Sequence, residues 1–573
     1  MTVARVLPNV TGLDKQFDYL VPTRLEPTAV LGAIVRVELH GRRVGGWVVE
    51  FDPRDAVEGV DLKPIAKVTG LGPAAELIDL AEWAADRWAG RRRHFLNAAS
   101  PDRAVTGLPS DRRTGSIVEP RSPASTSILE SGGGVLRLPP ASDPMPAILS
   151  AASIGPTLVV VPAVDQAMLL GARLRRSGLA VAVMPDDWAL AAGGADVVIG
   201  ARAAAWAPCP SLRCVVVIDE HDEGLQEEGS PTWHARDVLI ERARRAGAAV
   251  LLVSPAPTLV ALEWGELTRP PTARERAGWP IVDVIDRSDE EPWKRSLVTS
   301  ELIEHLRDPH RTVVCVSNTT GRARLLACRQ CRELTRCERC DAAVVQTDDD
   351  VLTCLRCGTE RPPVCLVCGA NRFANLRPGV TRLREELEAA ANRPAVLVTG
   401  KTGDRPSSAG VYVGTEAALH RVERADTVAF LDFDREVLAP RYRAAEQAMG
   451  LLVRAARLVG PRARGGRILV QTFIPHHEVI QAALLADPGR LTKRDRERRM
   501  MLGLPPFGAY GEISGTGSDE FVASIPPVDG VVIAGENGSY VARADDWLVL
   551  GRAINAGTRP TGARLRIAID PNR

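Results

Sequence analysis

Eight cysteines in four Cys-x-x-Cys pairs are the residues best suited to chemistry in this sequence. They are Cys328, Cys331, Cys337, Cys340, Cys354, Cys357, Cys365 and Cys368. A tight turn can aim both sulfurs of a pair at one ion, and tetrahedral Zn²⁺ takes four sulfurs, so the stretch predicts two closed structural zinc sites. No histidine lies among the cysteines and no ligand position is left for water, which argues against a catalytic metal.

The pairing of these cysteines has more than one solution. A nested arrangement fits best, with the two inner pairs closing one site across thirteen residues and the two outer pairs closing a second site around it. Tandem pairing of the first pair with the second, and the third with the fourth, stays open. A disulfide cluster is the other alternative, and the lack of a secretory signal at the start of the chain speaks against it.

Carboxylates at the end of a buried strand form a second candidate site. Asp219, Glu220 and His221 follow the apolar run 215–218, where nucleotide-hydrolysing motors place a Mg²⁺ ligand. Such a motor also needs a glycine-rich loop whose lysine reaches the phosphates.

That loop has no counterpart in the sequence. Residues 138–145 read Leu-Pro-Pro-Ala-Ser-Asp-Pro-Met at its expected position, and the prolines lack N–H donors. No lysine lies between Lys67 and Lys294. Gly400-Lys401-Thr402 follows a strand, but Ala395 replaces the first glycine and Pro406 disfavours the helix that should follow. The acidic box is therefore interpreted as a degenerate Mg²⁺ site, without bound ATP or Mg²⁺.

Composition indicates an ordinary globular protein of several domains. The chain has 573 residues, 45% hydrophobic and 25% charged, enough for about four domains. Net charge is +1, so any nucleic-acid surface depends on local arginine clusters such as 91–93 and 490–499. With no long apolar run and no signal pattern at its start, the protein is predicted to be cytoplasmic and associated with the nucleoid.

Hydrophobic periodicity predicts a multidomain α/β fold. Short alternating strands and one helix over 74–88 indicate a mostly β domain, and alternating buried strands and helices further on indicate two doubly wound RecA-like lobes. The predicted division is 1–105 mostly β N-terminal domain, 106–134 linker, 135–270 lobe 1, 271–326 and 372–475 lobe 2, 327–371 zinc module, and 476–573 small α+β C-terminal domain.

Several motifs together resemble the primosomal protein N′ family, the replication restart proteins PriA. The eight cysteines correspond one for one to the family's zinc ligands. The other matching motifs are Phe17 to Pro22, His234-Ala235-Arg236-Asp237, Val413 to Glu416, Tyr442 to Glu446, Leu502 to Gly508 and Ile569-Asp570-Pro571.

The resemblance implies a 3′→5′ DNA helicase that recognises abandoned forks and helps to reload the replicative helicase. Its N-terminal domain would capture a 3′ end. Phe17 would stack on the terminal base, Asp18 would meet the 3′ hydroxyl, Gly41 would allow close backbone approach and Lys63 would face a phosphate. A core role for Phe17 and a plain surface role for Lys63 are the alternatives. The zinc module would contact protein partners, such as primosome and helicase-loading proteins or single-stranded-DNA-binding protein, and single-stranded DNA.

Five parts of the motor depart from the family pattern. They are the phosphate loop, the shortened box at 219–222, Ser254-Pro255-Ala256-Pro257, Asn318-Thr319-Thr320-Gly321, and 454–461, which places Leu458 at the finger arginine. We therefore predict a fork-binding, primosome-assembling protein without ATPase or helicase activity. A weakly active ATP-dependent helicase is the alternative. The loader, the preferred fork and the oligomeric state are not predicted.

Overall fold

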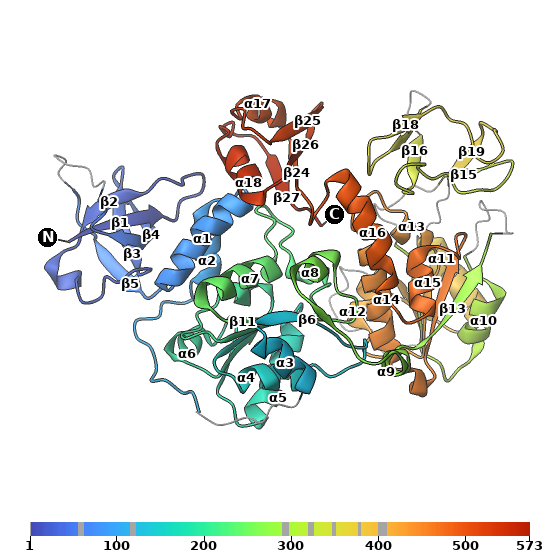
Figure 1. The fold of residues 1–573 in the computed structure, drawn as a ribbon, viewed down its shortest axis with the longest axis horizontal. Helices are drawn as coiled ribbons and strands as arrows, with labels where there is room; N and C mark the ends of the chain where they lie inside the picture. The colour runs from blue at the N-terminus through green and yellow to red at the C-terminus, as the bar shows by residue number, and fades with distance from the viewer. Residues whose placement is uncertain are drawn as a thin grey trace.

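The predicted multidomain α/β architecture is confirmed (Figure 1). The structure is a computed structural model that describes residues 2–54, 62–114, 122–288, 297–318, 326–346, 351–375, 380–398 and 410–572. Two parallel sheets of seven and six strands form the centre, and four smaller sheets lie around them. The Gly400-Lys401-Thr402 motif and residues 319–321 lie outside the described residues. Apart from the linker, which is described below, the residue boundaries given above for the domains stay predictions.

The N-terminal sheet curls towards a closed barrel. Its strands are β1 (Val3–Pro8), β2 (Phe17–Leu20), β3 (Ile34–Leu39), β4 (Arg42–Phe51) and β5 (Lys67–Gly70), in the order β2-β1-β4-β3-β5. The segment before β5 then meets β2, because Leu20 donates its N–H to the Lys63 carbonyl at 3.0 Å and Ile65 donates to the Leu20 carbonyl at 2.9 Å. This closure pairs the backbone of an edge strand that would otherwise be open.

Helices α1 (Ala75–Arg87) and α2 (Arg92–Ala99) leave this barrel and pack against the centre of the molecule. The small C-terminal sheet, in the order β25-β26-β24-β27, covers the same region. Its strands are β24 (Ala509–Gly515), β25 (Val532–Glu536), β26 (Ser539–Ala544) and β27 (Leu565–Ile569), with helices α17 (Ser518–Ala523) and α18 (Trp547–Asn555). One continuous apolar core joins α1, α2, lobe 1 and the C-terminal sheet.

Lobe 1 is a seven-stranded parallel sheet in the order β12-β6-β11-β10-β7-β9-β8. Its strands are β6 (Gly133–Arg137), β7 (Thr157–Val160), β8 (Val181–Val183), β9 (Val197–Gly200), β10 (Cys214–Ile218), β11 (Ala249–Ser254) and β12 (Leu267–Thr268). Helices α4 (Met145–Ala152), α5 (Val164–Arg176), α6 (Trp188–Gly193), α7 (Ala235–Ala246) and α8 (Leu259–Trp264) connect them. The central strands are buried along their whole length, as a sheet covered on both faces requires.

The predicted linker at 106–134 is wrong in its second half. Residues Pro123–Glu130 form helix α3, and β6 begins at Gly133 inside the lobe 1 sheet. Ser122 caps the helix by accepting the N–H of Ser125, and Pro123 takes the first helical position, where its missing N–H costs nothing. The Ser and Pro residues interpreted as linker composition are therefore the start signal of a helix.

Lobe 2 is a six-stranded parallel sheet in the order β13-β23-β22-β14-β21-β20. Its strands are β13 (Ile281–Asp286), β14 (Val313–Val316), β20 (Ala395–Val398), β21 (Val411–Gly414), β22 (Thr427–Phe430) and β23 (Arg467–Thr472). The helices of this half are α9 (Thr272–Gly278), α10 (Ser300–Arg307), α11 (Val380–Ala391), α12 (Ala417–Arg421), α13 (Asp434–Val437), α14 (Ala444–Val459), α15 (Glu478–Leu484) and α16 (Arg490–Leu502).

The cysteine module is inserted between β14 and α11, at the far end of the molecule from the barrel (Figure 1). Strands β15 (Leu326–Cys328) and β19 (Phe373–Asn375) pair at its base, and β16 (Val344–Gln346), β17 (Leu352–Cys354) and β18 (Glu360–Arg361) form a small sheet.

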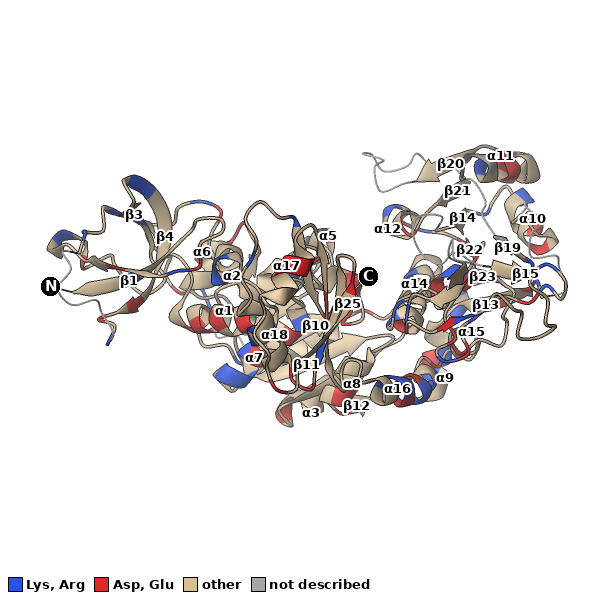
Figure 2. Cartoon of the chain, turned by 90° about the horizontal axis from the view of Figure 1, so that it is seen from above, with Lys and Arg blue, Asp and Glu red and all other residues tan. Residues whose placement is uncertain are grey.

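Charged residues of both signs are spread over the elements in Figure 2, with α16 marked by a dense group of basic residues. Within the described part of the chain, no helix combines the length and apolar character needed to cross a lipid bilayer.

Candidate metal centre and interlobe site

The four Cys-x-x-Cys pairs share one backbone geometry. In each pair, the N–H of the first cysteine donates to the carbonyl of the residue five positions later, at 2.8–2.9 Å. The carbonyl of the same cysteine accepts the N–H of the residue four positions later, at 2.9–3.0 Å. The residue four positions on is left-handed in every case, with φ of 69°, 63°, 72° and 74° at Arg332, Asp341, Gly358 and Gly369. Glycine takes this conformation without cost, whereas Arg332 and Asp341 adopt it under steric strain.

The knuckles bring the eight sulfurs together as two groups of four. One group is Cys328, Cys331, Cys365 and Cys368, and the other is Cys337, Cys340, Cys354 and Cys357. This is the nested arrangement that the spacing favours; tandem pairing does not occur.

The sulfur geometry fits zinc. All four sulfurs of a group lie within 4.8 Å of one another, and the closest contacts between pairs are 3.5 Å. Tetrahedral coordination at about 2.3 Å per Zn–S bond places sulfurs roughly 3.8 Å apart, whereas a disulfide requires about 2.05 Å. Both groups can therefore hold a metal ion.

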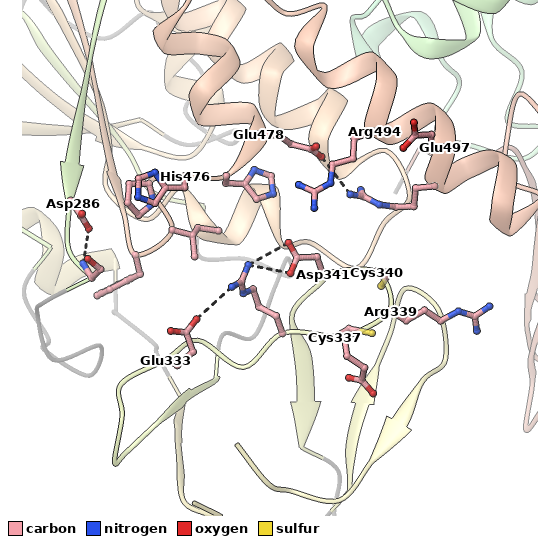
Figure 3. A pocket seen from close by; sticks show the side chains of 18 of the residues that line it. Asp286, Glu333, Cys337, Arg339, Cys340, Asp341, His476, Glu478, Arg494 and Glu497 are labelled. Carbon is pink, nitrogen blue, oxygen red and sulfur yellow. Dashed lines mark hydrogen bonds and ion pairs between the residues drawn. The ribbon is translucent and has the colours of Figure 1, made fainter. Parts of the chain in front are cut away.

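A pocket of about 840 Å³ lies between this module, the segment after β23 and helix α16 (Figure 3). Arg336 crosses it and contacts both Glu333 and Asp341 at 3.1–3.5 Å. Burial and the surrounding arginines, Arg498 first among them, lower the pKa of His477 to about 3, so its ring is neutral there. The walls carry both charges, with Arg339 and Arg494 facing the same space as Glu338 and Glu497.

The loop between β6 and α4 lies where an α/β motor would hold phosphates. Residues 138–144 form this loop, with Pro139, Pro140 and Pro144 lacking N–H groups. Ser142 donates its N–H to the Pro139 carbonyl at 2.9 Å, so that amide is used inside the loop. The carbonyl of Pro140 accepts the Nε–H of Arg457 at 2.9 Å, which a phosphate-binding loop would not do.

The acidic box follows β10 as predicted, and its side chains are already engaged. Glu220 is completely buried and accepts from Arg236 and from the hydroxyl of Thr258, both at 2.6 Å. Asp219 has a left-handed φ of 58° and pairs with Arg457. The His221 Nδ1 lies 2.9 Å from the Ser254 hydroxyl, and burial lowers the pKa of His221.

Two arginines of lobe 2 reach this box, and the sequence analysis gave them no role. Arg457 Nη1 contacts Asp219 at 2.6 Å and its Nη2 contacts the other carboxylate oxygen, while Arg454 contacts Asp222 at 2.8 Å. Burial raises the pKa of Asp219, but Arg457 outweighs it and the net pKa is lowered. Leu458, at the expected finger position, is buried in the lobe 2 core. The signal that could have identified Arg454 and Arg457 is their spacing with Gly450 along one helix face.

The residues predicted to bind a DNA 3′ end lie on the N-terminal barrel. Phe17 is partly buried against the barrel core, and the Lys15 ammonium lies 5.7 Å from its ring centre. Asp18 is paired with Arg5 at 2.9 Å, and exposed Lys63 is paired with Glu38 at 2.6 Å.

Gly41 occupies the tight turn between β3 and β4. Its φ is 77° and that of His40 is 49°, the pattern of a two-residue hairpin turn with both residues left-handed. No atom lies within 4 Å of a Cβ built at Gly41, so the turn faces open space. These observations place the four residues without testing their role.

Comparisons with known proteins agree with this architecture. A sequence model of the PriA family, described as "3'DNA-binding domain (3'BD)", matches residues 5–101. The chain is thus a multidomain α/β protein with two parallel-sheet lobes and two groups of four cysteines that can hold metal ions, and its N-terminal part is similar to a 3′ DNA-binding domain.

Curated proteins that are similar to this chain in sequence identify the class more closely. A probable replication restart protein PriA from Mycobacterium tuberculosis (strain CDC 1551 / Oshkosh) is 28% identical over 565 residues, covering 87% of this chain and 84% of the relative. The replication restart protein PriA of Bacillus subtilis (strain 168) is 26% identical over 360 residues, covering 58% and 45%. The chain is a relative of replication restart protein PriA, and the resemblance stated from its motifs is confirmed.

Among solved structures, S. cerevisiae Dbp5 bound to RNA and ADP BeF3 aligns with a TM-score of 0.34 at 11% identity, covering 75% of this chain and 98% of that one.

Proposed function

We propose that this protein binds abandoned or stalled replication forks through a DNA 3′ end and helps to assemble the primosome for helicase reloading, without hydrolysing ATP. One combination of observations carries the proposal. The chain has a domain similar to the PriA 3′ DNA-binding domain, while at the position expected for a nucleotide Arg457 binds both the Pro140 carbonyl and the Asp219 carboxylate. An ATP phosphate at that position would have to displace this guanidinium without a lysine to replace its charge.

In this proposal the barrel is the DNA-end site. Phe17 stacks on the terminal base, with Lys15 beside the ring as a cation for the neighbouring backbone. Asp18 and Lys63 exchange their partners Arg5 and Glu38 for the 3′ hydroxyl and a phosphate. The exposed Lys63–Glu38 ion pair contributes about 0–1 kcal/mol, so releasing Lys63 costs little. The Arg5–Asp18 pair is largely buried, so releasing Asp18 costs more.

The cysteine module is proposed to hold two Zn²⁺ ions that maintain its fold. Among its described residues the module has three short strand pairings and one small apolar cluster, so bound metal would supply much of its folding energy. The module would then present surface to primosome partners and to single-stranded DNA.

The test measures fork binding and ATP hydrolysis with the purified full chain. We expect tight binding to a fork with a free nascent 3′ hydroxyl, weaker binding when that end carries a 3′ phosphate, and no fork-stimulated hydrolysis. Phe17→Ala should remove the preference for the free end, whereas Lys67→Ala, an exposed lysine on β5, serves as the matched control.

Equal affinity for both fork ends would contradict the DNA-end proposal. Fork-stimulated release of phosphate, abolished by Asp219→Ala, would instead favour a weakly active ATP-dependent 3′→5′ helicase.

A further inference from the structure

One face of helix α14 is directed at lobe 1 along its whole length. Arg443, Gln447, Gly450, Arg454 and Arg457 are spaced by three or four positions, which places them on a single stripe of the helix. We call these five residues the α14 stripe. Every member contacts or closely approaches lobe 1 or the segment 569–572 that runs beside lobe 1.

The C-terminal half of the stripe closes on the acidic box. Arg454 pairs with Asp222 and Arg457 with Asp219, and both carboxylates are largely buried. A Cβ built at Gly450 would lie 3.5 Å from the His221 ring, so the α14 backbone passes close to this side chain. Breaking either ion pair would leave a buried carboxylate without its cation, which is costly.

The N-terminal half of the stripe holds residues 569–572 against lobe 1. Arg443 pairs with Asp570 at 2.7 Å, and Gln447 donates to the Asn572 carbonyl at 2.7 Å. From the opposite side, Gln226 of lobe 1 donates to the Asp570 carbonyl and Thr232 to the Ile569 carbonyl, both at 2.6 Å. This short segment is therefore bonded to both lobes at once.

A third contact joins the lobes between these two ends. The Glu446 carboxylate accepts the N–H of Leu259, the first residue of α8 in lobe 1, at 2.7 Å. That amide has no acceptor within its own helix because it lies in the first turn. The other oxygen of Glu446 pairs with Arg499 of α16 at 2.7 Å, which fixes the carboxylate.

We propose that the α14 stripe and residues 569–572 form a clamp that holds the two lobes in one closed arrangement without nucleotide. The clamp joins surfaces of the two lobes that would have to separate in every cycle of a translocating motor. The two lobes therefore act as one rigid support for the barrel and the cysteine module. The clamp rests on the proposed function, because it assumes that the lobes do not go through ATP-driven cycles. The clamp is measured without DNA, and ATP with Mg²⁺ is added in one comparison only.

Hydrogen exchange at the Leu259 amide is the test, because the acceptor of that amide belongs to the other lobe. In the wild-type chain we expect slow exchange of the peptide carrying Leu259, unchanged by ATP with Mg²⁺. The double variant Arg454→Ala/Arg457→Ala should exchange there at least tenfold faster, while peptides of the β10 core stay protected. Arg467→Ala removes an arginine–aspartate pair inside lobe 2, with Asp283, and should leave Leu259 unchanged.

Rapid exchange at Leu259 in the wild-type chain would overturn the clamp, as would unchanged exchange in the double variant. If the double variant does not fold, Gln447→Ala tests the other end of the stripe by the same measurement and the same criteria. ATP-induced acceleration at Leu259 in the wild-type chain would refute the clamp. Loss of fork binding with Leu259 still protected would refute only the proposed function.

Discussion

Replacing Arg454 by methionine removes a charge from the interlobe clamp while keeping a long apolar side chain. Its partner Asp222 has a side chain only 12% exposed, and Arg454 is 20% exposed. Burial by itself raises the pKa of Asp222. Arg454, His221 and the Gly224 N–H lower it by more than burial raises it, so the pKa falls from 3.8 to about 2. That difference corresponds to a free energy on the order of 2 kcal/mol, at about 1.4 kcal/mol for each tenfold change in proton affinity.

Arg454 accounts for the largest part of this lowering but not for all of it. The Gly224 N–H still donates to Asp222 at 2.8 Å in the variant. We therefore expect Arg454→Met to lower the free energy of unfolding by about 1–2 kcal/mol at pH 7. The sign follows from the depressed pKa of the folded state. The contribution is complete above pH 3.8 and is lost as the pH falls towards 2.

A double-mutant cycle isolates this pair. Urea unfolding of the wild type, Arg454→Met, Asp222→Asn and the double variant gives a coupling energy, expected at about 1–2 kcal/mol at pH 7 and smaller at pH 3. A coupling near zero at pH 7, or one that increases on acidification, would refute the assignment of this ion pair as part of the clamp.

Three further outcomes are expected. Cys340→Ser should lower the zinc content from two ions to one and increase proteolysis of the module. Cys315 is a buried cysteine outside both groups, so Cys315→Ser should keep both ions. Equal metal content in the two variants would contradict the ligand assignment. Phe17→Ala should weaken binding to a fork with a free 3′ end by about 1–3 kcal/mol, the usual worth of one base stacked on an aromatic ring, and an unchanged Kd would place Phe17 in the core alone. Lys63→Ala should reduce the slope of log Kd against log salt by about 1, and a slope equal to that of the wild type would exclude a phosphate contact.

The sequence predicted best where chemistry is local. Cys-x-x-Cys spacing determines a knuckle within a few residues, so the eight ligands followed from the sequence, whereas the choice between nested and tandem pairing needed the structure. The missing lysine was equally visible, because no lysine lies between Lys67 and Lys294. The buried strands β7 and β10 were recognisable from their continuous apolar runs.

What the sequence did not reveal depends on contacts between distant segments. Arg457 was described only as part of a damaged motif, because its partner Asp219 lies 238 residues earlier in the chain. Helix α3 was taken for linker because its eight residues are mostly small and polar, and Ile128 and Leu129 alone mark its buried side. The partners of Asp18 and Lys63 likewise come from other strands, so their pairing was invisible before the barrel was assembled.

The bond between Gln226 and Asp570 spans 344 residues, which has a consequence for biosynthesis. At about 5–20 residues per second, ribosomes need on the order of 20–70 seconds to make the chain between these partners. During that interval lobe 1 presents Asp219, Asp222 and their neighbours to water. The part of lobe 1 that receives α14 therefore carries hydrated carboxylates in the nascent chain, whereas the apolar core shared with the C-terminal sheet is completed only after that sheet has been made.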